Sequence, residues 1–410
     1  MPYPCRIRTA LCAFRHTAAR PSRKSWGDTV VHQEGSAVTA PDTDLSPQPG
    51  TDRGELLAQR LSDGAVGALE LFSVYLGTEL GLYRALERHG PLTPAGLAGR
   101  AGIAPRYARE WLEQQAVAGL LEAGGEESAD ERRYRLDPAH ARVLLHADDP
   151  AHVAPFAHLL AGIGGVLPQV AAAYRTGEGV PYEAYGAAFR HGQGRINRPA
   201  FTRELPTAWL AALPDVVARL EAAPGTGRRP RVADVGCGQG WAVLALARAF
   251  PHALVEGVDL DEASIADARD QAERAGLGDR TRLTCGDAAS MAGSGPYDLV
   301  LVLEALHDFA RPVEALRAVR AALAPGGAVL VADERVADRF TAPGDRVERM
   351  MYGWSVTHCL PTQLVERPSA ATGTVLRSGV LRGYAAEAGF RRCTVLPVDN
   401  DFLRLYRLDG

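Results

Sequence analysis

Hydrophobic positions follow two different patterns along this chain, and the change between them comes near residue 226. Beyond Pro230, short and nearly uninterrupted apolar runs alternate with stretches in which apolar residues recur every three or four positions. Uninterrupted apolar runs are typical of parallel strands that are covered by helices on both faces. We therefore predict an α/β, doubly wound domain over residues 226–410. Its expected strands are RVADVG, ALVEGVDL, TRLTCGD, YDLVLVLEAL and GAVLVADERV, and its expected helices include WAVLALARAF, DEASIADARDQAERAG and RPVEALRAVRAAL.

Residues 55–150 have a mostly helical pattern. Apolar residues recur at helical spacing up to Gly90, and Thr93-Pro94 then places an N-cap residue before a proline at the first helical position. Gly102 ends that short helix, and a second helix is expected over about residues 106–121. LLEAGG and RRYRLDP predict two short strands of a β-hairpin. Together these elements predict a winged-helix domain.

A winged helix raises the question of DNA binding. A recognition helix would present a basic face to the phosphates. Here Arg106 and Arg109 are offset by Glu110 and Glu113, while the neighbouring apolar residues indicate core or interface. The pattern favours a packing or dimerisation module over a nucleic-acid-binding one.

Residues 151–225 continue the helical pattern and are predicted to connect the two domains. Phe156–Tyr174 is apolar but is interrupted by His158, Pro168 and Gln169, so a buried core helix is expected rather than a membrane span. The segment GEGVPYEAYGAAFRHGQGRINRPAF is polar and aromatic. It is either an ordinary connecting loop or a lid that forms a pocket wall, and loops of this length favour the second interpretation.

Composition excludes several classes of protein. A net charge of −4 over 410 residues gives no global bias toward nucleic acid or acidic membranes. The six cysteines are far apart and form no CxxC pair, which argues against a disulfide framework or a zinc site and favours a cytoplasmic location. Residues 1–54 comprise an Arg-rich start and a Pro- and Ser-rich linker. A disordered extension is favoured there over a transit peptide or a nucleic-acid-binding arm.

Three glycines follow the first expected strand of the α/β domain. In RVADVGCGQGWAVLAL these are Gly236, Gly238 and Gly240. A glycine turn at a helix N-terminus leaves backbone N–H groups free and lets a ligand approach the main chain closely. A dinucleotide-binding fold would require a glycine at position 241, where this chain has Trp241. A pyrophosphate site is therefore disfavoured.

The G-x-G-x-G pattern, preceded by Asp234, resembles the first motif of class I S-adenosylmethionine-dependent methyltransferases. VEGVDLDEASI, CGDAAS, YDLVLVLEALHDF and LAPGGAVLVADERV resemble the later motifs of that family and follow in order. The resemblance implies a seven-stranded sheet and S-adenosyl-L-methionine as the cofactor. It further implies that Asp259 accepts hydrogen bonds from both ribose hydroxyls and that Asp287 accepts one from the adenine amino group. The implied cofactor contacts are Asp234, Gly236, Gly238, Gly240, Asp259, Leu260, Asp287, Ala288 and Glu304.

The ALHDF segment and the preceding winged helix resemble the small-molecule O-methyltransferases, whose motif is His-Asp-Trp. In that family the histidine deprotonates a hydroxyl, and His307 is at the matching position. Phe309 replaces the tryptophan, and ARPVEAL stands in place of the usual acidic stretch. The C-terminal segments YGWSVTHCLP, ERPSAATGTV and NDFLRLYRL resemble a poorly characterised bacterial subfamily of winged-helix methyltransferases more than plant-type enzymes. His307 is then either the general base or a structural histidine, with Asp308 and Glu334 as candidate orienting acids.

RMMYGWSVTHCLP predicts a helix after the fifth strand, with Met351, Trp354 and His358 on one face. That face is either core or the lining of a pocket. We predict that Met350–His358 and the connector form the acceptor pocket, with no metal ion. The predicted substrate contacts are Tyr182, Tyr185, Asn197, Met351, Trp354 and His358.

The predicted function is methyl transfer from S-adenosylmethionine to a small molecule, most simply to a hydroxyl of an aromatic or polyketide-like compound. The resemblance also implies a homodimer that forms through the N-terminal domain. Two alternatives stay open, because the glycine loop and the acids indicate only that the cofactor binds. One is a cofactor-binding transcriptional regulator that uses its winged helix on DNA. The other is a methyltransferase-like protein without methyl-transfer activity.

Overall fold

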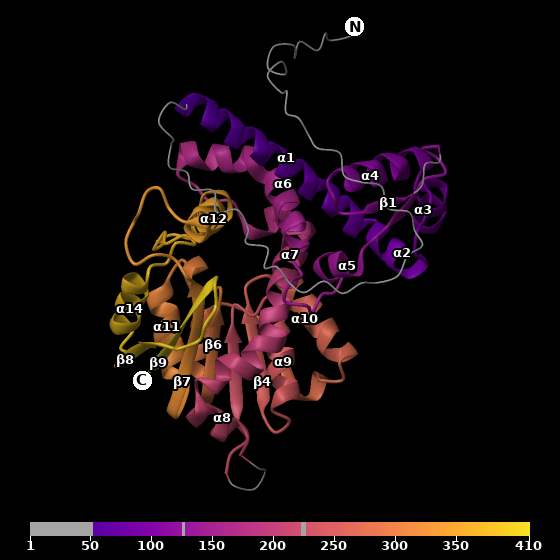
Figure 1. The fold of residues 1–410 in the computed structure, drawn as a ribbon. Coiled ribbons are helices and arrows are strands. Elements are labelled where there is room, and N and C mark those ends of the chain that lie inside the picture. Colours follow the sequence, from indigo (N-terminus) through magenta and orange to yellow (C-terminus); the bar gives the residue numbers. More distant parts are fainter. Residues whose placement is uncertain (1–51, 125–127, 223–226) are drawn as a thin grey trace.

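The computed structural model describes residues 52–124, 128–222 and 227–410, and in Figure 1 its helical N-terminal part lies above one end of a large sheet. Most of the predicted extension and linker, residues 1–51, is outside the described residues. The first helix begins at Arg53, inside the segment that we assigned to the linker.

A small helical domain with a two-stranded hairpin forms the N-terminal part. The side chain of Thr93 caps the third helix by accepting from the backbone N–H of Gly96, and Gly102 ends that helix in the left-handed conformation, as predicted. The fourth helix ends at Val117, four residues earlier than expected, because the chain turns there into the hairpin. The elements are α1 (Arg53–Glu79), α2 (Leu82–His89), α3 (Pro94–Ala101), α4 (Pro105–Val117), β1 (Glu122–Gly124), β2 (Arg133–Arg135) and α5 (Pro138–Leu144).

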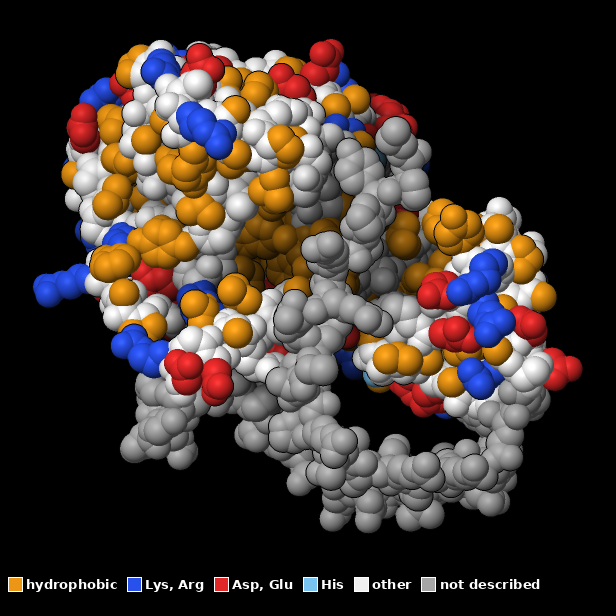
Figure 2. All heavy atoms as spheres, turned by 90° about the horizontal axis from the view of Figure 1, so that it is seen from above, with side chains coloured by type: hydrophobic (Ala, Val, Ile, Leu, Met, Phe, Trp, Pro, Cys, Tyr) orange, Lys and Arg blue, Asp and Glu red, His pale blue; other side chains and the backbone are white. Residues whose placement is uncertain are grey.

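The upper surface of the molecule carries two kinds of side chain. Seen from above, many hydrophobic side chains lie on the larger, left-hand part of the surface, whereas Arg and Asp or Glu interleave on the smaller, right-hand part (Figure 2). On α4 the interleaving takes the form of ion pairs, since Arg106 pairs with Glu110 and Arg109 lies 3.1 Å from Glu113. α4, which would be the recognition helix of a DNA-binding winged helix, therefore has no surplus of positive charge.

The connector consists of α6 (Pro155–Thr176), a 3-10 turn (Tyr182–Tyr185), α7 (Gly186–Pro199), a π-helical segment (Ala200–Trp209) and α8 (Pro214–Leu220). The polar, aromatic segment is thus largely helical, and not a loop. α7 packs closely against α6 at two glycines. A Cβ on Gly192 of α7 would lie 3.0 Å from His158 Cβ, and a Cβ on Gly162 of α6 would lie 2.5 Å from Phe189 Cβ. These two glycines let the helices pack closely, which stabilises α7 as a helix.

By length and composition α6 could cross a membrane, and so could α1 with α2 if that bent pair is counted as one span. In the fold, however, α6 packs against α7 and α1, and Ile163, Val166 and Val170 form a cluster with the connector residue Phe189. This packing buries one face of α6, but only 39% of its apolar stretch is buried, so the helix is partly exposed and is not the buried core helix that we predicted.

The C-terminal domain is a seven-stranded sheet with the order β5-β4-β3-β6-β7-β9-β8. β3 to β7 are parallel, and β9 lies antiparallel between β7 and β8. The strands are β3 (Arg231–Val235), β4 (Leu254–Asp259), β5 (Thr281–Cys285), β6 (Tyr297–Leu303), β7 (Leu323–Glu334), β8 (Arg392–Val395) and β9 (Leu403–Asp409). The helices are α9 (Trp241–Ala249), α10 (Glu262–Arg274), α11 (Pro312–Ala321), α12 (Arg346–Trp354), α13 (Leu360–Gln363) and α14 (Ser378–Glu387).

Helices on both faces bury the central strands, as the apolar runs predicted. Every residue of β6 is buried. Leu299 and Leu301 pack into the core on one face of the sheet, and Val300 and Val302 pack into the core on the other. The chain moves outward from β3 to β5 and then returns to place β6 beside β3. Ligands bind at such a reversal of strand order, at the carboxyl ends of the strands.

Candidate active site

A cavity of about 650 Å³ opens at the carboxyl ends of β3, β4 and β6. The glycine loop forms its floor, and Tyr182 and Arg190 of the connector form one wall. Of the predicted cofactor contacts, those that line this cavity are Gly236, Gly238, Asp259, Leu260, Asp287, Ala288 and Glu304. The predicted contacts thus come from four separate loops and are brought together in one place.

The glycine loop is shaped by backbone conformations that favour glycine. Gly236 has φ +78°, and a Cβ there would lie 2.6 Å from Ala305 Cβ. The backbone N–H groups of Gly236 and Cys237 both donate to the carbonyl of Val258, which fixes the loop against β4. A side chain at position 236 would therefore displace the loop from the strand that carries Asp259.

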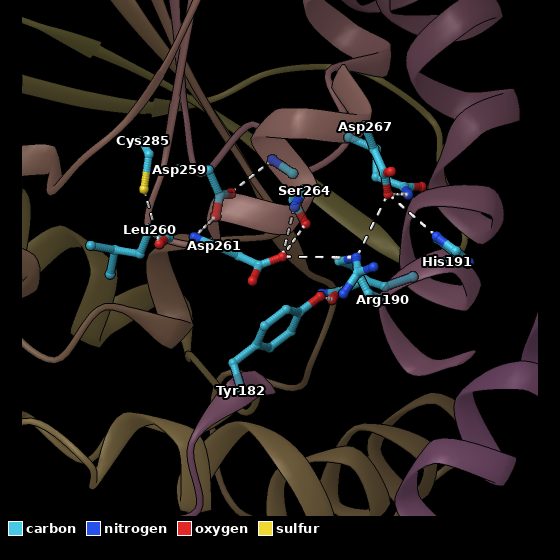
Figure 3. A network of polar contacts seen from close by, with 12 residues as sticks. Tyr182, Arg190, His191, Asp259, Leu260, Asp261, Ser264, Asp267 and Cys285 are labelled. Atoms are coloured by element: carbon cyan, nitrogen blue, oxygen red, sulfur yellow. Dashed lines mark hydrogen bonds and ion pairs between the residues drawn. The ribbon is translucent and has the colours of Figure 1, made fainter. Parts of the chain in front are cut away.

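Asp259 ends β4 and faces the cavity (Figure 3). Its Oδ2 accepts from the backbone N–H of Gly238 at 2.8 Å, and its Oδ1 accepts from that of Asp261 at 2.9 Å. Burial raises the pKa of Asp259, while these two backbone donors act in the opposite direction. Each carboxylate oxygen has a second lone pair, so Asp259 is able to accept from two further hydroxyl groups. This capacity fits the vicinal hydroxyls of a ribose.

Ionic contacts hold the connector against this site. The Arg190 guanidinium lies 3.6 Å from Asp267 and 4.0 Å from Asp261, and His191 Nε2 lies 3.3 Å from Asp267 (Figure 3). Asp261 also caps α10 by accepting from the backbone N–H of Ser264. α7 therefore forms part of the wall of this cavity.

A second cavity of about 270 Å³ adjoins the first. Four residues line both cavities, namely Gln193, Asn197, Glu304 and Asp308. The predicted catalytic and substrate residues that line the second cavity are His307, Asn197, Met351, Trp354 and His358. The face of α12 on which core and pocket were both considered thus borders a cavity. A small molecule in this cavity would be next to a ligand in the larger one.

His307 is buried where the chain leaves β6, and both ring nitrogens have neighbours. Nδ1 lies 3.0 Å from Asp333 Oδ1, and Nε2 lies 3.5 Å from Asp308 Oδ1. A carboxylate can only accept, so Nδ1 keeps its proton in both charge states of the ring, and Nε2 is the nitrogen that gains or loses one. Burial lowers the pKa of His307, but Asp308 and Asp333 outweigh it and hold the pKa well above its ordinary value.

Of the two acids that the sequence suggested beside His307, Asp308 lies 3.5 Å from Nε2, but Glu334 does not contact the imidazole, and Asp333 bonds Nδ1 instead. Asp333 and Glu334 both end β7, and neighbouring residues of a strand point to opposite faces. The side chain of Asp333 faces His307, and that of Glu334 faces the second cavity. Two successive acids at the end of a central strand were the signal for Asp333, but only the register of β6 and β7 shows which one meets the imidazole.

Among the described residues, His307, Asp308 and Cys359 bring one potential metal ligand each to within 4.8 Å of one another. Burial, followed by the charge of Asp308, raises the pKa of the Cys359 thiol to about 12. A protonated thiol is a poor metal ligand. The donor set therefore suits a hydrogen-bonded cluster around His307 better than a metal centre.

Three predicted contacts lie elsewhere. Asp234 is buried in β3 and lines neither cavity, and burial followed by the nearby Asp259 raises its pKa to about 8. Gly240 also lines neither cavity. It begins α9 with φ +77°, and its close approach to Ala268 serves packing against α10. Tyr185 is buried within the connector and donates to the Thr357 carbonyl at 2.8 Å, so it is a packing residue.

Two residues of the connector, Tyr182 and Gln193, line the cavities in a way that the sequence did not predict. Tyr182, predicted to contact the acceptor, lines the larger cavity instead and donates to Gln193 at 2.8 Å. Gln193, which lines both cavities, was not among the predicted site residues. It lies four residues before Asn197, one helical turn along the same face of α7. The polar residues of this amphipathic helix were the available signal.

Comparisons with known proteins agree with the geometry. A methyltransferase domain model matches residues 232–327, and a winged helix-turn-helix model named Rv2258c-like matches residues 67–146. The chain is 33% identical over 255 residues to the tetracenomycin polyketide synthesis 8-O-methyl transferase TcmO of Streptomyces glaucescens, covering 60% of this chain and 70% of that protein. It is 28% identical to the acetylserotonin O-methyltransferase of Mus musculus, over 81% of this chain and 83% of that protein.

Other curated relatives are matched over shorter stretches, which cover 25% and 44% of their own length. Among solved structures, human N-acetylserotonin methyltransferase in complex with SAM has the same fold, with a TM-score of 0.57, 19% identity and coverage of 89% of this chain and all of that one. A doubly wound sheet with a glycine loop and a strand-end carboxylate in the cavity is typical of enzymes that bind a nucleoside cofactor. The chain belongs to the class I S-adenosylmethionine-dependent methyltransferases that carry an N-terminal winged helix. It is a methyltransferase, and S-adenosyl-L-methionine is its cofactor.

Proposed function

We propose that this protein methylates a hydroxyl group of a small aromatic molecule and that His307 is the general base. The observation that carries the proposal is the position of His307, which lines the smaller cavity beside the walls shared with the cofactor cavity. The names of TcmO and of the acetylserotonin enzymes, which are O-methyltransferases, support this choice of acceptor atom.

The residues divide the work between the two cavities. Asp259, the glycine loop and Asp287 would hold the cofactor in the larger cavity. When bound, the cofactor supplies a methyl group on a positively charged sulfur, which is activated for in-line displacement. Asp333 holds Nδ1 of His307, so that Nε2 is able to accept the proton of an acceptor hydroxyl. Phe156, Phe189 and Trp354 line the smaller cavity and would exclude water from the acceptor.

We also propose that α1 forms a homodimer interface. Its exposed apolar residues are Leu56, Leu57, Leu61, Val66, Leu69, Phe72, Leu76 and Leu80. A patch of this size on one helix is typical of a protein–protein contact. The paired charges on α4 support a packing role for the winged helix over DNA binding. The described cysteines are all free, which supports a reducing, cytoplasmic location.

The proposal is tested by incubating the purified protein with a deuterated methyl donor and a panel of phenols, followed by mass spectrometry. We expect a labelled methyl ether. His307→Ala should lower turnover about a hundredfold or more, in the range that a general base contributes, while affinity for S-adenosylhomocysteine stays near wild type. Full turnover in that variant would exclude His307 as the base. Labelled products on nitrogen or carbon only, or none, would exclude O-methylation.

A further inference from the structure

The lining of the smaller cavity contains several acidic side chains and, among the described residues, no lysine or arginine. The acidic side chains are those of Glu204, Glu304, Asp308 and Glu334. His307 is the one group close to these acids that offers a compensating charge, and it is already engaged by Asp308 and Asp333. A buried carboxylate without a cationic partner is costly, so a ligand is expected to supply what the chain does not.

Among the acidic residues of this cavity, Glu334 is the one that most clearly lacks a partner in the described structure. Its exposed fraction is only 8%, and it lines the smaller cavity but not the larger one. Its backbone N–H donates to Asp333 Oδ1 at 3.0 Å. No hydrogen bond or ion pair reaches its carboxylate from any of the described residues. Burial raises the pKa of Glu334 well above its ordinary value, with the nearby Glu304 as the second cause. The side chain thus has no partner in the cavity wall, and a cation bound beside it would lower its pKa and favour the charged carboxylate.

Glu304 stands beside Glu334 at the boundary of the two cavities. It has φ +49°, which is rare for a residue other than glycine, and its side chain hydrogen-bonds Asn197 of the connector. Burial raises the pKa of Glu304 to about 7. Because Glu304 lines both cavities, it would lie beside a bound cofactor as well as beside the acceptor. Glu334 is left for the acceptor.

Aromatic side chains line the same cavity as these acids. Phe156 and Trp354 are stacked, with ring centroids 6.1 Å apart and planes 17° from parallel. His358 also lines the cavity, and its Nε2 is buried without a partner in the described structure. Burial lowers the pKa of His358 to about 4, so this ring is neutral. Aromatic faces and carboxylates together are the groups that bind organic ammonium ions.

We propose that the smaller cavity contains an ammonium subsite, in which Glu334, together with Glu304 and the Phe156–Trp354 pair of the same lining, binds a positively charged amine of the acceptor. The inference rests on the proposed function only in that it treats this cavity as the acceptor site. The amine anchors the molecule and is not itself methylated. The hydroxyl that reacts lies at the His307 end of the same cavity. The substrate class is therefore an aromatic compound that carries both a hydroxyl and an amine.

The test measures binding alone and involves no methyl transfer. Three probes of similar size are titrated by calorimetry into the protein saturated with S-adenosylhomocysteine, which fills the larger cavity. Phenethylamine is a cation, 2-phenylethanol is neutral and 3-phenylpropanoate is an anion. One charge-assisted hydrogen bond corresponds to about tenfold or more in affinity. We expect phenethylamine to bind at least about tenfold more tightly than the alcohol, and the anion to bind most weakly.

Glu334→Gln keeps the size of the side chain and removes its charge, so the amine and the alcohol should then bind within about twofold of each other. Glu387→Gln is the matched control, because Glu387 is exposed at the end of α14, and the preference should persist. If Glu334→Gln does not fold, Glu304→Gln should reduce the preference at least about threefold, since a neighbouring charge is lost.

Equal binding of the amine and the alcohol by the wild-type protein, including no detectable binding of either, would overturn the subsite. So would an undiminished preference in folded Glu334→Gln. With a labelled methyl donor, methylation of phenethylamine at nitrogen would place the amine at the reaction centre and overturn the anchoring role. None of these results depends on whether a phenol is methylated, so failure of the subsite and failure of the proposed O-methylation are distinguishable.

Discussion

Replacing Asp333 by asparagine tests how the fold prepares His307 for proton transfer. The two side chains are buried and lie 3.0 Å apart between the ends of β6 and β7. Asparagine has nearly the same shape, but it carries no charge and is able to donate through its amide nitrogen. The variant therefore loses both the charge that stabilises a protonated His307 and the preference for a proton on Nδ1.

The size of the effect follows from this contact. A hydrogen bond to a charged group contributes about 1.5–3 kcal/mol, and about 1.4 kcal/mol corresponds to a factor of ten in rate. We therefore expect kcat of Asp333→Asn to fall about tenfold to a hundredfold. The affinity for S-adenosylhomocysteine should stay within about twofold of wild type, because Asp333 does not line the cofactor cavity.

The pH dependence gives a second, independent readout. In the wild type Asp308 and Asp333 hold the pKa of His307 well above its ordinary value, so activity should rise only when the pH passes that raised value. Without the charge at position 333, the pKa of His307 falls and the acid limb of the kcat/KM profile moves to lower pH. Asp338→Asn is the control, since Asp338 is exposed on the segment after β7. An unchanged profile and an unchanged kcat in Asp333→Asn would refute the orienting role.

Four further predictions address other parts of the molecule. Asp259→Ala removes two backbone-bonded oxygens from the cofactor cavity and should weaken S-adenosylhomocysteine binding by at least about tenfold in calorimetry; unchanged affinity would remove Asp259 from the ribose site. Tyr185→Phe loses only its bond to the Thr357 carbonyl and should lower the free energy of unfolding by about 1 kcal/mol without changing the acceptor KM; an increased KM would return Tyr185 to the pocket. Burial raises the pKa of Glu334, so the native state binds its proton more tightly than the unfolded state and loses stability as the pH rises. The gain in Tm from Glu334→Gln should therefore increase from about pH 5 to about pH 8, and pH-independent curves would contradict this. Leu61→Glu combined with Leu69→Glu, at positions that are 65% and 66% exposed, should produce a monomer by light scattering, whereas a persisting dimer would mean that α1 is not the interface.

For His307, the sequence predicted a position at the site but not the acid that bonds the imidazole. The position of the histidine after a buried strand was enough to predict that it borders the site, and its lining of the smaller cavity agrees with that placement. The identity of its partner was not predictable, because Asp333 and Glu334 are adjacent and chemically alike. The pairing of Val302 with Val331 and of Leu303 with Ala332 sets the register of β6 and β7 and decides which acid meets the imidazole.

The connector shows a second limit. Tyr182 and Tyr185 belong to one short aromatic segment, and nothing in their sequence separates them. In the fold, the 3-10 turn sends Tyr182 toward the cofactor cavity and Tyr185 into the packing between α6 and the Ser355–Cys359 turn. Which side chain of a turn faces a cavity depends on the elements packed around it, and these come from distant parts of the chain.

By itself the sequence determined the order of the elements, the alternation of strand and helix, the glycine turn and the strand-end acid at position 259. These features depend on local hydrophobic periodicity and on backbone conformations that neighbouring residues impose. The tertiary structure decided which groups are neighbours: Asp333 and His307, Arg190 and Asp267, and Glu334 and the aromatic residues of a cavity whose described lining has no lysine or arginine. These contacts depend on sheet register and helix packing, since residues far apart in the chain become neighbours only when the buried faces of their strands and helices pack together.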